Sequence, residues 1–142
     1  MIIGQAGYSI FDSTPTTFLL ASGIEDAEWS DFKQRYQDIQ RGYAPKERIP
    51  IKHCVNNIWL VKPSNANQGR GIEIFSELDE LTYFVNSRPH FTCCVVQKYV
   101  ERPLLFKGRK FDIRVWALFT GKNEVFLYKH GYLRTSSDDY NL

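Results

Sequence analysis

The stretch from Asn57 to Ile74 reads NIWLVKPSNANQGRGIEI, and it decides how the rest of the chain is interpreted. Ile58–Val61 and Ile72–Phe75 are rich in β-branched and aromatic residues, and the segment between them holds proline, serine, asparagine and glycine. This pattern predicts a β-hairpin with Lys62 at the end of its first strand, where Pro63 stops the ladder. Glycine lets backbone N–H groups approach a ligand, and the lysine supplies a positive charge. The hairpin is therefore suited to phosphate.

The hairpin by itself does not establish a phosphate site. It lacks the Lys-Ser/Thr that follows the second glycine of a P-loop, and it has no G-x-G-x-x-G opening a helix. Gly69-Arg70-Gly71 alone is more typical of an ordinary turn. Support for a functional site has to come from other parts of the chain.

Composition sets broad limits on fold and function. The 142 residues are 43% hydrophobic and 24% charged, which is typical of a globular domain. Aromatic residues make up 15% and fall mostly in strand-like runs, which indicates a sheet with well-filled faces. The net charge of +2 is too small to indicate nucleic-acid binding through charge alone. No apolar run has the length of a membrane span and no signal peptide is recognisable, so a cytoplasmic protein is expected.

The cysteines and histidines show no metal-ligand spacing. Cys54, Cys93 and Cys94 are odd in number, which fits a reducing compartment. Neighbouring Cys93 and Cys94 point to opposite faces if they lie on a strand, so we expect core thiols that do not pair. The three histidines are expected to have structural roles: His53, His90 and His130.

Two helices are predicted. Residues 1–23 show no stable period and are expected to be loop with one short strand. The first helix, ending at Gly42, has an aromatic stripe expected to face the core: Trp29, Phe32, Tyr36 and Ile39. A Ser76-x-x-Asp79 capping signal predicts the second helix, which stops near Arg88-Pro89. Its apolar face comprises Leu78, Leu81, Phe84 and Val85.

Strand-like runs follow the second helix. Phe91–Val100 is the first, and Phe111–Thr120, FDIRVWALFT, is expected to be one continuous strand. Gly121-Lys122-Asn123 makes a turn, and Val125–Tyr128 returns as the partner strand.

Charged residues gather on one side of the FDIRVWALFT strand. Lys110, Asp112 and Arg114 alternate and therefore point to the same face, and Arg134, just past the partner strand, is placed to face the same cleft. One interpretation is a solvated face with a cross-strand ion pair. The other is a site where cations hold phosphate oxygens beside an acid. The residues by themselves favour neither.

Four motifs occur in order, NIWLVKP with GRGI, VVQKYVERPLL, GRKFDIRVWALF and YLRTSSDDY. Together they resemble the tubulin tyrosine ligase-like family of the ATP-grasp superfamily, from about Asn57 to the end of the chain. The resemblance implies an α+β, ATP-grasp-like fold of antiparallel sheets with flanking helices. It also implies three regions: a lead-in with one amphipathic helix over 1–46, a central lobe with the lysine hairpin and a Gly-rich lid over 47–96, and the hinge and first strands of a C-terminal lobe over 97–142.

The resemblance also implies roles for individual residues. Lys62 would contact the α- and β-phosphates of ATP. The lid over the phosphates would be Gln68, Gly69, Arg70 and Gly71. The hinge whose backbone reads the adenine edge would be Gln97, Lys98 and Tyr99. Lys110 and Asp112 match residues near the ribose and phosphates. Arg114 and Arg134 match catalytic cations at the γ-phosphate and the acyl phosphate.

The reaction implied is ATP-dependent carboxylate–amine ligation. ATP phosphorylates a carboxyl group of a tubulin tail, and the amine of glycine, glutamate or tyrosine displaces the phosphate. The expected partners are the acidic tails of tubulin or microtubules and a free amino acid, with neither nucleic acid nor membrane. The expected location is the cytoplasm and cytoskeleton, including the cilium or basal body. Thr135-Ser136-Ser137 differs from many glutamylases, which favours a glycylase or a divergent member.

One family feature is missing from these residues. Family members bind Mg²⁺ through an Asp and a later Glu-x-Asn, and the sequence reaches Leu142 before either appears, so no metal ligand is assigned. We therefore expect a domain truncated before its metal-binding part and inactive by itself. An alternative is a degenerate paralogue or fragment that binds nucleotide or microtubules without turnover. A nucleic-acid binder using Lys107–Arg114 is disfavoured, because the basic residues end at one turn.

Overall fold

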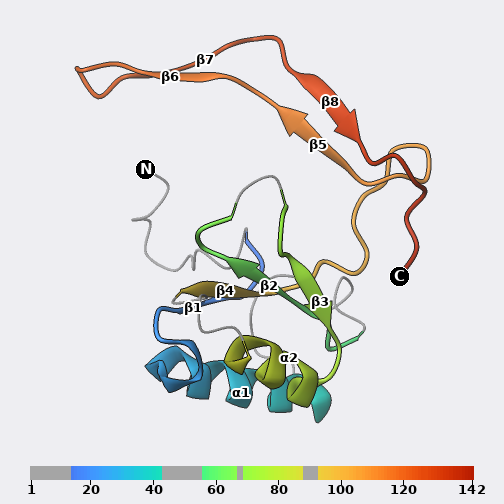
Figure 1. Cartoon of the computed structure of the whole chain (residues 1–142). Helices are drawn as coiled ribbons and strands as arrows, with labels where there is room; N and C mark the ends of the chain where they lie inside the picture. The colour runs from blue at the N-terminus through green and yellow to red at the C-terminus, as the bar shows by residue number, and fades with distance from the viewer. Residues whose placement is uncertain (1–13, 43–55, 67–68, 88–92) are drawn as a thin grey trace. The chain divides into compact units, whose positions relative to one another are not determined.

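The computed structural model describes residues 14–42, 56–66, 69–87 and 93–142. The chain divides into two compact units, Met1–Arg102 and Pro103–Leu142, and each is described by itself (Figure 1). In the part of the chain that the structure describes, no helix is long and apolar enough to cross a membrane.

A four-stranded antiparallel sheet forms the centre of the first unit. Its order is β1-β4-β2-β3, with bounds β1 Thr17–Leu20, β2 Trp59–Pro63, β3 Glu73–Phe75 and β4 Cys94–Lys98. The predicted hairpin is confirmed as β2 and β3, with Trp59 opposite Phe75. The short strand predicted near the N-terminus is β1. Pro63 is the last residue of β2, as expected for a residue that ends a ladder.

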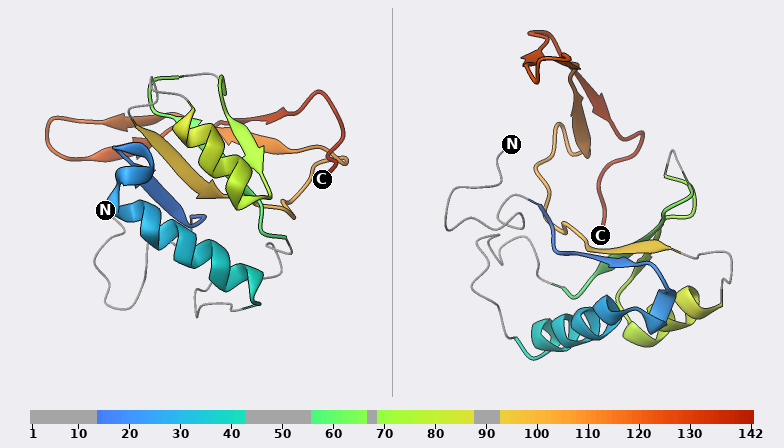
Figure 2. Two further views of the ribbon diagram at one scale, coloured as in Figure 1. Left: turned by 60° about the horizontal axis from the view of Figure 1, so that its bottom comes forward. Right: turned by 90° about the vertical axis from the view of Figure 1, so that its left-hand side faces the viewer.

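Two helices cover one face of this sheet (Figures 1 and 2). The 3-10 turn η2 Gly23–Glu25 leads into α1 Ala27–Gln40, and Asp26 caps the helix by accepting the N–H of Glu28. Gly42 has a φ of 75°, a left-handed conformation that suits glycine after a helix end. The first predicted helix is therefore confirmed, with its end in the expected place.

The second helix is α2, Leu78–Asn86, but its predicted cap is wrong. Glu77, not Ser76, occupies the cap position, and it makes no side-chain cap hydrogen bond. Ser76 has another role, because its carbonyl oxygen accepts the Tyr36 hydroxyl at 2.6 Å. This bond ties the start of α2 to α1.

The core lies between the helices and the sheet. Its ten buried residues are each at most 5% exposed: Leu20, Trp29, Phe32, Tyr36, Trp59, Val61, Leu81, Val85, Cys94 and Val96. The Phe32 ring is at its centre, with ring centroids 5.0 Å from Trp59 and 5.7 Å from Phe18. The predicted aromatic stripe of the first helix is confirmed as its core face.

Cys94 is a buried free thiol, and burial raises its pKa to about 11. We expect native Cys94 to be alkylated by iodoacetamide at pH 8 about a hundredfold more slowly than in urea, because only the thiolate reacts. The folded state also binds the thiol proton of Cys94 more tightly than the unfolded state does. The contribution of Cys94 to the free energy of unfolding is therefore full below pH 9 and declines as pH rises through 11. Mass spectrometry after timed labelling gives the rate. Equal rates in native buffer and urea would contradict the assignment of Cys94 to the core.

The second unit is a ribbon of two short antiparallel pairs. β5 Phe111–Arg114 pairs with β8 Tyr132–Thr135, and β6 Ala117–Phe119 pairs with β7 Val125–Leu127. The predicted partner strand is confirmed as β7. The single strand predicted over Phe111–Thr120 is wrong, because the strand is interrupted at residues 115–116.

Gly131 explains the interruption. A Cβ placed there would lie 2.8 Å from the Arg114 carbonyl oxygen, so the backbone at Gly131 approaches the backbone at Arg114 more closely than a side chain allows. We expect Gly131→Ala to displace the backbone at the β5–β6 junction and destabilise the ribbon by ~1–3 kcal/mol. Gly121→Ala is the matched control, since a Cβ there meets nothing within 4 Å. Urea unfolding followed by near-ultraviolet circular dichroism measures both, and equal midpoints would contradict the close approach.

Candidate active site

A chain of polar side chains crosses the sheet on the face away from the helices. Residues alternate along β2 and β4, so Trp59 and Val61 enter the core while Lys62 lies on the other face. Lys62 Nζ donates to Gln97 Oε1 at 2.8 Å, and Gln97 Nε2 donates to Thr17 Oγ1 at 2.8 Å. Three neighbouring strands thus contribute one polar residue each: Thr17 and Gln97 are directly opposite in the register, and Lys62 reaches Gln97 diagonally, because Leu60 is the residue of β2 opposite Gln97.

Lys62 is suited to hold an anion at this face. Its side chain is half-buried, and its ammonium has three N–H groups, of which Gln97 accepts one. Gln97 fixes the ammonium without neutralising it, because an amide carries no charge. The prediction that Lys62 contacts phosphate is compatible with this geometry and stays a prediction.

The predicted lid ends close to the same strand end. Gly69 and Gly71 have φ values of 76° and 71°, which other residues rarely adopt. A Cβ at Gly71 would lie 3.1 Å from Pro63 Cγ, so the lid passes directly beside the residue after Lys62. Arg70 is exposed between the two glycines, and Gln68 lies outside the described residues.

The predicted hinge is more firmly held than the sequence indicated. Gln97 and Lys98 are the last residues of β4, and Tyr99 follows. The Lys98 N–H donates to the Thr16 carbonyl oxygen at 2.8 Å, and the Tyr99 N–H donates to that of Ile58 at 3.0 Å. The prediction that this backbone reads adenine therefore depends on groups other than these two N–H groups.

The Lys98 side chain has a partner that the sequence interpretation missed. It forms a buried ion pair with Glu101, at 2.6 Å between Nζ and Oε1. Both side chains are in the interior, so the Lys98 ammonium is committed to the fold. The available signal was the Lys-x-x-Glu spacing of Lys98 and Glu101 within the VVQKYVERPLL motif.

In the second unit the structure brings the predicted acid and one of the two predicted catalytic cations together. Asp112 and Arg134 are cross-strand partners in β5 and β8. Arg134 Nε donates to Asp112 Oδ1 at 2.7 Å, and Nη2 donates to Oδ2, so the contact is bidentate. The hydrogen bond from Arg134 lowers the pKa of Asp112, and the charges of Arg134 and Arg114 lower it further.

Arg114 lies at the end of β5, and Lys110 directly precedes this strand. Arg114 is opposite Tyr132, two positions along the register from the Asp112–Arg134 pair. Lys110 Nζ is 4.6 Å from the centre of the Tyr140 ring. Asp112, Arg114 and Arg134 therefore share one face of the β5–β8 pair, as the alternation predicted. Among the described residues, no group of three acidic, histidine or cysteine side chains is placed to hold a metal ion, so we assign no residue to Mg²⁺.

A model of the tubulin-tyrosine ligase family matches residues 8–142. The chain belongs to the tubulin-tyrosine ligase family. The family match extends the similarity well beyond the four motifs, because it begins before β1 and includes α1 and α2.

Relatives within the tubulin-tyrosine ligase family are glycylases by name. The chain is 34% identical over 140 residues to tubulin monoglycylase TTLL3 of Mus musculus, covering 81% of this chain and 15% of that protein. It is 44% identical over 139 residues to tubulin monoglycylase TTLL3 of Homo sapiens, covering 80% and 18% respectively. Tubulin glycylase 3C of Tetrahymena thermophila is 36% identical over 116 residues, covering 80% and 11%. The chain thus spans less than a fifth of the length of these relatives.

Proposed function

We propose that this chain is the nucleotide-binding region of an ATP-dependent ligase that attaches glycine to tubulin tails. The observation that carries the proposal is the Lys62–Gln97 pair on the sheet face away from the helices, beside the glycine-containing lid, in a member of the tubulin-tyrosine ligase family. The glycylase names of the relatives support glycine as the amino acid.

The proposed reaction has two steps. A carboxylate oxygen of the tubulin tail forms a bond to the γ-phosphorus of ATP while the bond to the leaving oxygen breaks, giving an acyl phosphate and ADP. The amine of glycine then attacks the acyl carbon, phosphate leaves, and the nitrogen loses a proton to give the amide. The acyl phosphate hydrolyses readily in water, so a lid that closes over it protects the intermediate.

Each unit contains residues with a proposed role in this reaction. In the first unit, Lys62 and the backbone of Gly69 and Gly71 hold the phosphates of ATP. In the second, Arg114 and Arg134 stabilise the negative charge on the transferred phosphoryl group, and Asp112 holds the Arg134 guanidinium in one orientation. A planar guanidinium fixed in this way is prepared for the transition state before the substrates arrive.

Replacing Lys62 tests the nucleotide site. We expect Lys62→Ala to weaken ATP binding by ~1.5–3 kcal/mol, or roughly 10- to 150-fold, the range for a hydrogen bond to a charged group. Stability should change little, because Lys62 is half-buried at a strand end. Isothermal titration with ATP and thermal unfolding of the 142-residue chain give both values.

Lys122→Ala is the matched control, because it removes the same charge from the exposed turn between β6 and β7. Its ATP affinity should equal that of the parent. If Lys62→Ala and Lys122→Ala bind ATP equally well, the hairpin is an ordinary turn and the proposed nucleotide site is wrong.

A further inference from the structure

The Lys98–Glu101 ion pair is the most deeply buried charged feature of the described residues. Lys98 is 5% exposed and Glu101 is 1% exposed, although lysine and glutamate are almost never this buried without a specific reason. The ammonium also lies 5.8 Å from the centre of the Trp59 ring, on the core side of the sheet. The pair follows directly after Gln97, which lies on the opposite face with Lys62.

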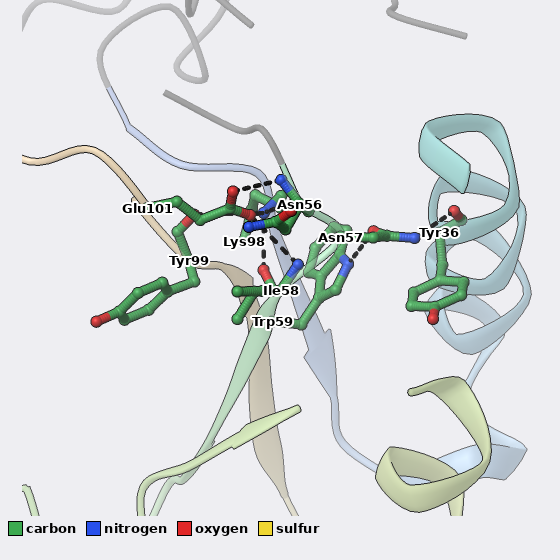
Figure 3. Close-up of polar contacts among 8 residues, drawn as sticks. All are labelled: Tyr36, Asn56, Asn57, Ile58, Trp59, Lys98, Tyr99 and Glu101. Carbon is green, nitrogen blue, oxygen red and sulfur yellow. Dashed lines mark hydrogen bonds and ion pairs between the residues drawn. The ribbon is translucent and has the colours of Figure 1, made fainter. Parts of the chain in front are cut away.

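Six hydrogen bonds join the pair to the backbone and to itself (Figure 3). Lys98 Nζ donates to the carbonyl oxygens of Asn56, Ile58 and Tyr99, at 3.1, 2.8 and 3.4 Å. The Glu101 carboxylate accepts the N–H groups of Asn56 and Ile58. The two side chains therefore hold the segment before β2 against the bend that follows β4.

This arrangement is a poor means of gaining stability. Removing two charges from water costs several kcal/mol per ion, and apolar residues of similar volume often stabilise a protein as much or more. A satisfied polar network fixes one geometry, because each side chain has to meet several partners at once. The geometry fixed here is that of residues 97–101, immediately before the first unit ends at Arg102.

We propose that Lys98 and Glu101 are positioning residues of the nucleotide site. They hold the backbone from Gln97 to Glu101 in the conformation that receives the adenine ring, while Lys62 and the lid receive the phosphates. This inference rests on the proposed function and on the prediction that the segment from Gln97 to Tyr99 contacts adenine. Binding of adenine would then depend on the ion pair, whereas binding of the phosphates would not.

Glu101→Asp is the variant that tests positioning, because it keeps the charge and shortens the side chain by one methylene group. The carboxylate can then no longer reach Lys98, Asn56 and Ile58 together without moving the bend. We expect ATP affinity to fall about tenfold, the equivalent of losing one or two neutral hydrogen bonds to adenine. The affinity for inorganic tripolyphosphate, which has no adenine, should stay within about twofold of the parent.

Leu81→Ala is the matched control for stability. It creates a cavity in the core of the same unit, on α2, and should lower the melting temperature while leaving the ratio of ATP to tripolyphosphate affinity unchanged. Titration of the 142-residue chain with each ligand, together with thermal unfolding, supplies all the values. Lys98→Arg, which also keeps the charge, replaces Glu101→Asp if that variant does not fold.

The outcomes separate this inference from the proposed function. A selective loss of ATP affinity in the charge-conserving variant supports positioning. Equal losses for both ligands, no loss for either, or failure of both variants to fold would show that the pair is only part of the scaffold. A parent chain that binds neither ligand would overturn the proposed function, and this inference with it.

Discussion

Changing Arg134 to lysine is expected to lower the rate of glycine transfer by roughly 100- to 1000-fold, while ATP affinity stays within about threefold of the parent. The guanidinium of Arg134 meets Asp112 through two parallel hydrogen bonds, which fixes its plane on the β5–β8 face. A lysine ammonium is a point charge and cannot reproduce this fork. The lost interaction is one made mainly in the transition state, so turnover falls more than binding. Arg114→Lys should behave in the same way.

The measurement needs turnover and binding from the same protein. Labelled glycine incorporated into tubulin gives kcat, and titration gives the ATP Kd, both in the longest protein that contains these residues. Arg109→Lys is the matched control, because Arg109 forms an exposed ion pair with Asp139 in the same unit, at 3.2 Å. If Arg109→Lys reduces turnover as strongly as Arg134→Lys, the effect is not specific to the proposed site.

If Arg114→Lys and Arg134→Lys both keep the turnover of the parent, the proposed catalytic role of the two arginines is wrong. The charged face of β5 and β8 would then be a solvated surface with a cross-strand ion pair, which is the alternative that the sequence left open. A protein that binds ATP without transferring glycine would support the non-catalytic reading of the chain.

Changing Lys98 to methionine is expected to destabilise the chain by ~3–5 kcal/mol. The variant leaves the Glu101 carboxylate buried without its counter-ion, and the cost of an uncompensated buried charge is in this range. It also leaves the carbonyl groups of Asn56 and Ile58 without the donor they have in the parent. Since small domains are stable by only about 5–15 kcal/mol, a large fraction of stability is lost. The free energy of unfolding in urea is the quantity to measure.

Arg109→Met provides the comparison for this second experiment. It removes the cation of an exposed ion pair, whose partner carboxylate stays in water, so the free energy of unfolding should be nearly unchanged. A Lys98→Met variant as stable as Arg109→Met would mean that the Glu101 carboxylate reaches water or takes up a proton at little cost.

Local pattern determined the elements and the faces of this protein. The aromatic spacing of Trp29, Phe32 and Tyr36 fixed the buried side of α1, because residues three and four apart share a helix face. The alternation of Asp112 and Arg114 placed both charges on one side of β5 for the equivalent reason in a strand. The β2–β3 hairpin followed from two strand-like runs joined by turn residues. The four motifs were sufficient to recognise the family.

Only the tertiary structure decided which elements became neighbours. The strand β4 lies between β1 and β2. The hydrogen bonds between strands join backbone groups that every residue carries, so the sequence of a strand does not specify its neighbours. At the interruption between β5 and β6, Gly131, the residue directly before β8, closely approaches the Arg114 carbonyl group. Only folding places the Lys98 ammonium beside the buried Glu101 carboxylate. Local periodicity fixes the face on which a side chain lies, whereas its partner depends on segments that only folding brings together.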